Sequence, residues 1–415
     1  MHNEILFINI AKLLKVRERN ELLRGADLAI LPVIEDAFLL IEDGYITDFG
    51  AMFELEIKIP QLPKNIINVS GQFILPCWCD SHTHIVFAGS RENEFVDKIK
   101  GASYAEIASN GGGILNSAKK LNETSDEELY TTALERLNEI AKLGTGNVEI
   151  KSGYGLSVEG EIKMLRVIKR LKENSDLLIK STFLAAHTYP TEFKENHRGY
   201  IDCIINEMLP VISKENLADF IDVFCESGFF SPEEMNEICV AGAAVGLKPK
   251  LHVNQLNSIG AIEIGIKNNA LSLDYLETLS EEEISLLGNF KGCSTLLPTA
   301  AFFLRMTFQP ARKLINAGAA VTLASDYNPG SSPSGNMNFV TALSCIQMKM
   351  LPEEVINAAT INGAYAMSCE EETGSIMIGK RADIILTKKI PSIAYMFYSF
   401  SINNIDRVML KGKWV

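Results

Sequence analysis

The sequence predicts an α/β protein: a (β/α)8 barrel with a small β-sandwich domain that is built from both ends of the chain. Three observations lead to this fold class. In the middle of the chain, strand-like apolar runs alternate with helical patterns eight times. The two ends instead contain short β segments joined by turns. The chain has 415 residues, 47% of them hydrophobic, which suffices for a barrel of about 250 residues and an appended domain.

The two ends of the chain are expected to combine into one small domain. In the N-terminal segment, Asp43-Gly44 separates two apolar runs and is typical of a hairpin turn. The C-terminal segment has a similar run with a turn-type glycine at 408–414. We therefore expect a composite β domain from residues 1–72 and 365–415 and a barrel domain from residues 73–364.

The eight expected barrel strands are apolar runs of the middle segment. They lie at 73–84, 147–152, 179–186, 220–225, 249–253, 270–276, 293–297 and 320–324. The helical patterns between them include 125–143, 159–172, 231–245 and 278–287. In barrels of this kind, active sites lie at the C-terminal ends of the strands, so the residues that follow each run are the first functional candidates.

Two histidines one residue apart, His82 and His84, end the first expected strand. Side chains two positions apart on a strand point to the same face, so both imidazoles aim at one point, as a metal ion requires. The alternative is a chance pair of surface histidines. With six histidines in the chain, composition alone predicts roughly 0.1 pairs of this kind.

Other metal-ligating residues end further strands. His187 ends the third strand, His252 the fifth, and Asp326 follows the eighth. Any one of these histidines could be a core residue, but together they form a pattern that chance explains poorly. Three imidazoles and one carboxylate leave an open position for water, whose pKa a bound Zn²⁺ lowers from about 15.7 to about 7. Hydrolysis of a polar C–N bond is the reaction class that fits.

These residues, in this order, resemble the metal site of the amidohydrolase superfamily, and longer motifs resemble the imidazolonepropionase family within it. The matching runs are 80–92, 111–114, 149–156, 182–187, 222–226 and 326–332, with a tail at 374–383. The resemblance implies histidine degradation, in which the imidazolone ring of 4-imidazolone-5-propanoate is opened by hydrolysis to N-formimino-L-glutamate.

The resemblance also implies roles for individual residues. The metal ligands would be His82, His84, His252 and Asp326, holding one divalent or trivalent ion per chain, zinc or iron. The catalytic residues would be Asp326, His252 and Tyr275. The substrate-binding residues would be Arg91, Tyr154, His187, Gln255, Asn328, Gly330 and Ser331. A guanidinium suits the substrate's propionate, because it can bind a carboxylate with two hydrogen bonds.

Simpler interpretations of these residues stay open. Arg91 could form a surface salt bridge, and Tyr154 could serve packing alone, although its Gly-Tyr-Gly context favours an exposed ring that faces substrate. The segment from Asn328 to Ser331 could bind an anion on backbone N–H groups, or it could be a tight turn.

Two positions depart from the common family pattern. Gln255 stands where many members have an acidic residue, and glutamine can orient a ring but cannot act as a base. Tyr275 stands where the family usually has histidine. A tyrosine hydroxyl can donate to a developing oxyanion, but its ordinary pKa of about 10 makes it a poor proton shuttle.

Bulk composition excludes several partners. The net charge is −13, whereas binding nucleic acid requires a basic surface. The chain has no run of about 18 apolar residues, so no membrane span is expected. Met1–Glu4 lacks the basic start of a signal peptide, and the eight cysteines, scattered in mostly apolar runs, are expected to be free thiols. We therefore expect a cytoplasmic protein.

The remaining expectations concern substrate and assembly. The resemblance implies a homodimer and a small substrate that carries a carboxylate. One alternative is another cyclic amidine or amide hydrolase, or a deaminase, of the same superfamily. Another is a barrel that binds a ligand without turnover. Arg91 argues against a neutral nucleobase as substrate, and the intact ligand set argues against a binding protein.

Overall fold

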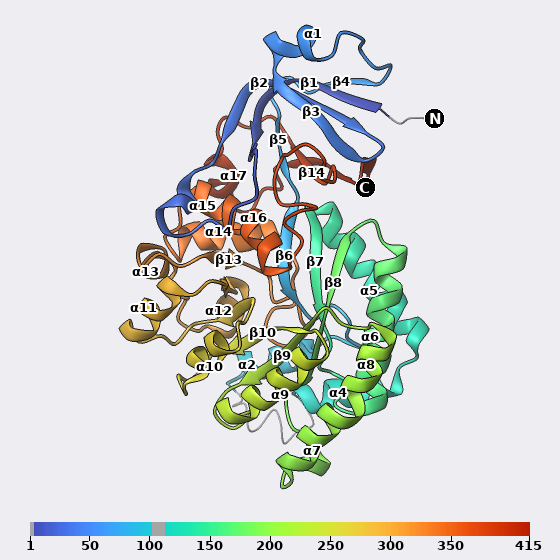
Figure 1. Ribbon diagram of the computed structural model, residues 1–415, viewed down its shortest axis with the longest axis vertical. Helices are drawn as coiled ribbons and strands as arrows, with labels where there is room; N and C mark the ends of the chain where they lie inside the picture. Colours follow the sequence, from blue (N-terminus) through green and yellow to red (C-terminus); the bar gives the residue numbers. More distant parts are fainter. Residues whose placement is uncertain (1–3, 102–112) are drawn as a thin grey trace.

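Eight parallel strands form the barrel in chain order (Figure 1). They are β6 (Trp78–Thr83), β7 (Thr145–Lys151), β8 (Leu178–Ala186), β9 (Phe220–Cys225), β10 (Lys248–Val253), β11 (Ser272–Tyr275), β12 (Cys293–Leu296) and β13 (Val321–Leu323). The computed structural model describes residues 4–101 and 113–415. Backbone bonds between the segment after β13 and β6 nearly close the ring: Asp326 N–H donates to the His82 carbonyl (3.0 Å), and His84 N–H donates to the Tyr327 carbonyl (2.9 Å). The predicted barrel is confirmed.

Helices cover the outside of the barrel (Figure 1). The longer ones are α2 (Glu92–Ile99), α4 (Ile114–Glu123), α5 (Asp126–Lys142), α6 (Val158–Asn174), α9 (Pro232–Ala244), α11 (Glu281–Asn289) and α14 (Met337–Ile346). The shorter α-helices are α1 (Leu55–Lys58), α7 (His197–Cys203), α8 (Leu209–Glu215), α10 (Ala261–Lys267), α12 (Pro298–Leu304), α13 (Ala311–Asn316), α15 (Pro352–Ala358), α16 (Ile361–Ala366) and α17 (Tyr395–Tyr398).

The four predicted helices are present, and one begins later than expected. Helix α11 begins at Glu281 rather than at Thr278, because Ser280 caps it. The Ser280 hydroxyl accepts from Glu283 N–H (3.1 Å), and the Glu283 carboxylate accepts from Ser280 N–H (2.7 Å). Such a capping box fixes the first turn of a helix.

A second sheet combines strands from both ends of the chain, as predicted, and it is one mixed sheet. Its order is β16-β15-β14-β5-β1-β2-β3, and β4 pairs with β1. The strands are β1 (Glu4–Leu14), β2 (Val33–Glu42), β3 (Tyr45–Ala51), β4 (Ile66–Asn68), β5 (Phe73–Pro76), β14 (Ile384–Thr387), β15 (Ile405–Leu410) and β16 (Lys413–Trp414). In Figure 1 this sheet, in blue and red, lies at the upper end of the barrel.

The apolar run from Phe73 to His84 is two strands, not the single strand that we expected. Strand β5 pairs with β1 and β14 in the mixed sheet, and the chain then enters the barrel as β6. Cys77 joins the two strands, and its N–H donates to the Asp383 carbonyl (2.9 Å). The boundary between β5 and β6 lies where Pro76 ends β5 and where the chain changes its pairing partners. The small sheet therefore extends past residue 72, the limit expected for its N-terminal part.

The predicted hairpin turn at Asp43-Gly44 is confirmed. It joins β2 to β3, and both residues have the positive φ values, 48° and 87°, that a two-residue turn of this kind requires. Lys411-Gly412 forms the matching turn between β15 and β16. The two turns touch, since a Cβ at Gly412 would lie 2.7 Å from the Cα of Gly44.

All eight cysteines are free thiols, as predicted, and six of them are buried. Among the described residues, the helices are too short or too polar to cross a lipid bilayer.

Candidate metal centre and active site

Three histidines meet at the C-terminal end of the barrel strands. One ring nitrogen each of His82, His84 and His252 lies within 4.8 Å of the others, and all three side chains are buried. Asp326 Oδ1 lies 3.6 Å from Nε2 of His82 and from Nε2 of His84. The structure thus brings together the four residues that the sequence predicts as metal ligands.

The atoms of this cluster fit a metal ion. His82 Nε2, His252 Nε2 and Asp326 Oδ1 are buried without a hydrogen-bond partner. A buried polar atom without a partner costs about 1–3 kcal/mol, and such atoms are rare in native proteins. Imidazole nitrogens and a carboxylate oxygen around one point are the donors that zinc and iron accept.

Two aspartates orient the imidazoles. His82 Nδ1 lies 2.7 Å from Asp274 Oδ2, and His252 Nδ1 lies 2.7 Å from Asp222 Oδ2. A carboxylate accepts from Nδ1–H, which leaves the lone pair on Nε2. Both Nε2 atoms therefore carry the lone pair that a metal ion binds.

A buried lysine connects these two aspartates. Lys151 Nζ donates to Asp222 Oδ2 (2.9 Å) and to Glu149 Oε1 (2.7 Å), and it lies 3.9 Å from Asp274 Oδ2. Lys250 Nζ lies 3.1 Å from Glu149 Oε2. Burial disfavours the charged form of Lys151, but the three carboxylates outweigh burial and raise its pKa. Lys151 is therefore charged and offsets the carboxylates behind the metal centre.

The backbone has unusual conformations at Tyr275 and Asp326, whose side chains lie beside the three histidines. Tyr275 (φ 86°), Leu276 (φ 65°) and Asp326 (φ 54°) lie in the left-handed region, which residues with a Cβ rarely adopt. The Tyr275 hydroxyl donates to Asp326 Oδ2 (3.1 Å), and the Ser331 hydroxyl donates to the same oxygen (2.9 Å). Burial raises the pKa of Tyr275. Its one hydroxyl proton is therefore directed at Asp326.

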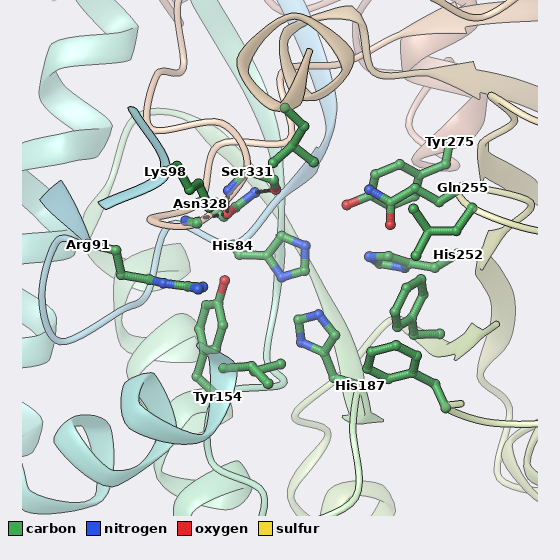
Figure 2. Close-up of a pocket in the computed structure, with 16 residues that line it drawn as sticks. His84, Arg91, Lys98, Tyr154, His187, His252, Gln255, Tyr275, Asn328 and Ser331 are labelled. Atoms are coloured by element: carbon green, nitrogen blue, oxygen red, sulfur yellow. Dashed lines mark hydrogen bonds between the residues drawn. The ribbon is translucent and has the colours of Figure 1, made fainter. Parts of the chain in front are cut away.

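A cavity of about 430 Å³ opens beside the cluster (Figure 2). Its lining includes all seven predicted substrate-binding residues, together with Tyr275, His84 and His252. These seven are Arg91, Tyr154, His187, Gln255, Asn328, Gly330 and Ser331. The volume suits a small-molecule site.

A buried glutamate shapes the loop that carries Tyr154. Glu161 accepts from the N–H groups of Gly153 (3.1 Å), Gly155 (2.7 Å) and Leu156 (2.9 Å). A Cβ at Gly155 would lie 2.2 Å from the Glu161 nitrogen, so only glycine fits there. The tyrosine ring lines the cavity but is only 3% exposed. The ring is therefore buried and not exposed as expected, because it packs against His84 and His187 at the cavity wall.

His187 belongs to the cavity wall and not to the cluster of three histidines. Its Nδ1 lies 3.1 Å from the Gly153 carbonyl. Burial and the neighbouring His252 lower its pKa to about 3. His187 is therefore a neutral polar group beside His84, whose ring centroid lies 5.4 Å away.

The segment from Asn328 to Ser331 forms a tight turn. The N–H groups of Gly330 and Ser331 donate to Asn328 Oδ1 at 2.7 and 2.8 Å. These two donors are used inside the turn, in contrast to the expected anion contact through backbone N–H groups. A Cβ at Gly330 would lie 2.3 Å from Arg91 Nη1, so glycine lets the guanidinium rest against the turn.

Sequence reasoning missed Asp222, Asp274, Lys151 and Lys98. The first three lie in barrel strands, where they alternate with apolar residues. This alternation was the available signal that their side chains point into the barrel. Lys98 lies on a helix, where a lysine is usually solvent-exposed. Residues 111 and 112 of the matching run 111–114 lie outside the described residues.

Comparisons with known proteins identify relatives over nearly the whole chain. The imidazolonepropionase of Flavobacterium johnsoniae is 57% identical over 98% of this chain and 99% of its own. That of Christiangramia forsetii is 52% identical over 99% and 100% of the two chains. That of Thermoanaerobacter pseudethanolicus is 41% identical over 93% and 91%.

Solved structures share the fold at low sequence identity. A triazine hydrolase variant has a TM-score of 0.74 at 14% identity and covers 99% of this chain and 94% of its own. The guanine deaminase of C. acetobutylicum has a TM-score of 0.72 at 17% identity and full coverage of both chains. These likenesses establish the barrel with its additional sheet. The family model described as "Amidohydrolase family" matches residues 73–415. The chain belongs to the amidohydrolase family and, within it, to the imidazolonepropionases.

Proposed function

We propose that this protein is a metal-dependent hydrolase that opens the imidazolone ring of 4-imidazolone-5-propanoate to N-formimino-L-glutamate in histidine degradation. The observation that carries the proposal is the buried cluster of three histidines and Asp326, whose unpartnered atoms adjoin a cavity with cationic side chains on its wall. The relatives named imidazolonepropionase support it.

The reaction adds one water to the ring. The water oxygen bonds to the ring carbonyl carbon, the bond from that carbon to the ring nitrogen breaks, and the nitrogen takes up a proton. A metal ion bound by His82, His84, His252 and Asp326 supplies the Lewis acidity that makes water a nucleophile at neutral pH.

The residues of the chain handle the proton and the substrate. Asp326 accepts the proton of the attacking water and passes it to the leaving nitrogen, while Tyr275 and Ser331 hold its Oδ2 in place. Neutral His187 and Gln255 contact the ring, because both line the cavity. Arg91 binds the propionate.

The finer features of the proposal are the metal, the assembly and the compartment. We propose zinc or iron, one ion per chain, since imidazole and carboxylate suit both. We also propose a homodimer and a cytoplasmic location. Elemental analysis of protein purified without added metal identifies the ion, and sedimentation equilibrium measures the assembly.

The test of the function is turnover by the purified protein with its metal counted. We expect loss of imidazolone absorbance and stoichiometric appearance of N-formimino-L-glutamate, with no turnover of guanine or of cyclic ureides without a carboxylate. A protein with one metal ion per chain that fails to turn over imidazolone propionate contradicts the proposal.

A further inference from the structure

Lys98 lies on the wall of the active-site cavity, and the proposed reaction gives it no role so far. It belongs to helix α2, one turn after Glu94, and it lines the cavity together with Arg91. Figure 2 shows it above Arg91 in this view, beside Asn328 and Ser331.

Arg91 already has a carboxylate partner. Its Nη2 lies 2.5 Å from Glu94 Oε2, and Glu94 Oε1 accepts from Gly113 N–H (2.9 Å). Together, Arg91 and Glu94 carry no net charge. Arg91 can still contact a ligand, because its side chain lines the cavity. It can orient a carboxylate, but it brings no uncompensated charge.

Lys98 places a positive charge on the cavity wall that no described carboxylate offsets. Among the described residues, no carboxylate lies within 4.0 Å of its ammonium group. The side chain is half-buried, and burial together with Arg91 lowers its pKa, whereas Glu94 raises it. An ammonium group in this position gains from an added anion.

The rest of the cavity wall provides no such anion. Its residues within the described part of the chain include no aspartate or glutamate. Among the described residues, the wall away from the metal cluster therefore carries the ammonium group of Lys98 without a carboxylate partner, and one substrate carboxylate would neutralise this charge.

We propose that Lys98 selects the substrate by charge: its ammonium group supplies the positive charge that the side-chain carboxylate of the substrate neutralises, while Arg91 orients that carboxylate. The inference deepens the proposed function and rests on it, since it assigns the carboxylate end of the same substrate.

The kinetic test compares three metal-loaded proteins: the wild type, Lys98→Met and Lys100→Met. Lys100 is the matched control, because its side chain is exposed and lies two residues after Lys98. Lys98→Met is expected to raise KM for imidazolone propionate about tenfold or more and to change kcat little, because the lost interaction is present in both the bound substrate and the transition state. Lys100→Met is expected to match the wild type.

A binding test separates charge recognition from structural damage. Calorimetry measures Kd for 3-(imidazol-4-yl)propionate and for its neutral primary amide. The wild type is expected to prefer the acid, and Lys98→Met to lose affinity for the acid alone. Equal losses for acid and amide, or unchanged affinity for the acid, would overturn the inference. A wild type that prefers the acid but fails to turn over imidazolone propionate contradicts only the proposed function.

Discussion

At the scale of single residues, a few hydrogen bonds fix which atoms of the metal centre carry protons. Asp274 and Asp222 fix the tautomers of two ligand histidines, and Tyr275 donates its only proton to Asp326. Tyr275 also lines the cavity, and its hydroxyl bonds to the residue that we propose as the proton carrier.

Replacing Tyr275 by phenylalanine is expected to lower kcat about tenfold or more, because a hydrogen bond to a charged group contributes about 1.5–3 kcal/mol. Ser331 keeps its own bond to Asp326, so some activity is expected to remain. Steady-state kinetics measure the change. Tyr398→Phe is the control, since that ring is 82% exposed, and an unchanged kcat in Tyr275→Phe would exclude the role.

Glycine at position 330 is expected to contribute to substrate affinity through the position of Arg91. In Gly330→Ala, the new Cβ would lie 2.3 Å from Arg91 Nη1, so the guanidinium has to move. We expect KM to rise about tenfold, since the substrate loses a charged hydrogen bond. Gly89→Ala is the control, because its Cβ would meet nothing closer than 3.9 Å. Equal KM values for the two variants would contradict this prediction.

At the scale of elements, the strands of the barrel place charged residues behind the metal centre. Lys151 at the end of β7 joins Asp222 on β9 and approaches Asp274 on β11. All these side chains are buried, so the ammonium group of Lys151 offsets part of the negative charge of the two aspartates within the barrel. The orientation of two ligand histidines thus depends on a lysine from a third strand.

Lys151→Met is expected to weaken zinc binding about 10–100-fold, as changes in the groups that orient metal ligands commonly do. It is also expected to lower the free energy of unfolding by about 3–5 kcal/mol, since buried carboxylates lose their counter-charge. Calorimetric titration of the metal-free protein and denaturant unfolding measure the two effects.

Lys142→Met, an exposed change, is the control. If Lys151→Met does not fold, Asp222→Asn tests the same network, because it keeps the side-chain size and removes the charge beside His252. Unchanged zinc affinity in both variants would contradict the role of the network.

The sequence predicted those elements whose pattern is local. Strand β9 and helix α5 follow from an apolar run and an amphipathic repeat. The places at strand ends indicate the candidate metal-binding residues, His187 among them, and the family resemblance selects four of these as ligands. The break between β5 and β6 was not predictable, because both strands are apolar and only pairing separates them. Lys98 was missed because a lysine on a helix is usually solvated, and its orientation toward the cavity depends on tertiary packing.

At the scale of the whole molecule, metal binding is expected to stabilise the fold. The unpartnered atoms of His82, His252 and Asp326 come together only in the folded chain, so a metal ion binds the native state in preference to the unfolded one. At a free metal concentration 100 times Kd, the gain is about 2.7 kcal/mol.

Removal of the metal by a chelator is expected to lower Tm by several degrees, and added zinc or iron to restore it. Calorimetric scans of metal-loaded and metal-free protein measure the shift. In His84→Ala the two scans are expected to coincide. A wild type whose Tm does not depend on metal would contradict the stabilisation.

The mixed sheet sets an order of events during synthesis. Strand β5 is complete near residue 76, but its partner β14 begins at Ile384. While the ribosome makes the barrel, the edge of β5 that later pairs with β14 is open, and an open edge can pair with another chain. Nascent chains that stall before residue 384 are therefore the form of this protein most exposed to aggregation, and the last 32 residues complete the sheet that the first 76 begin.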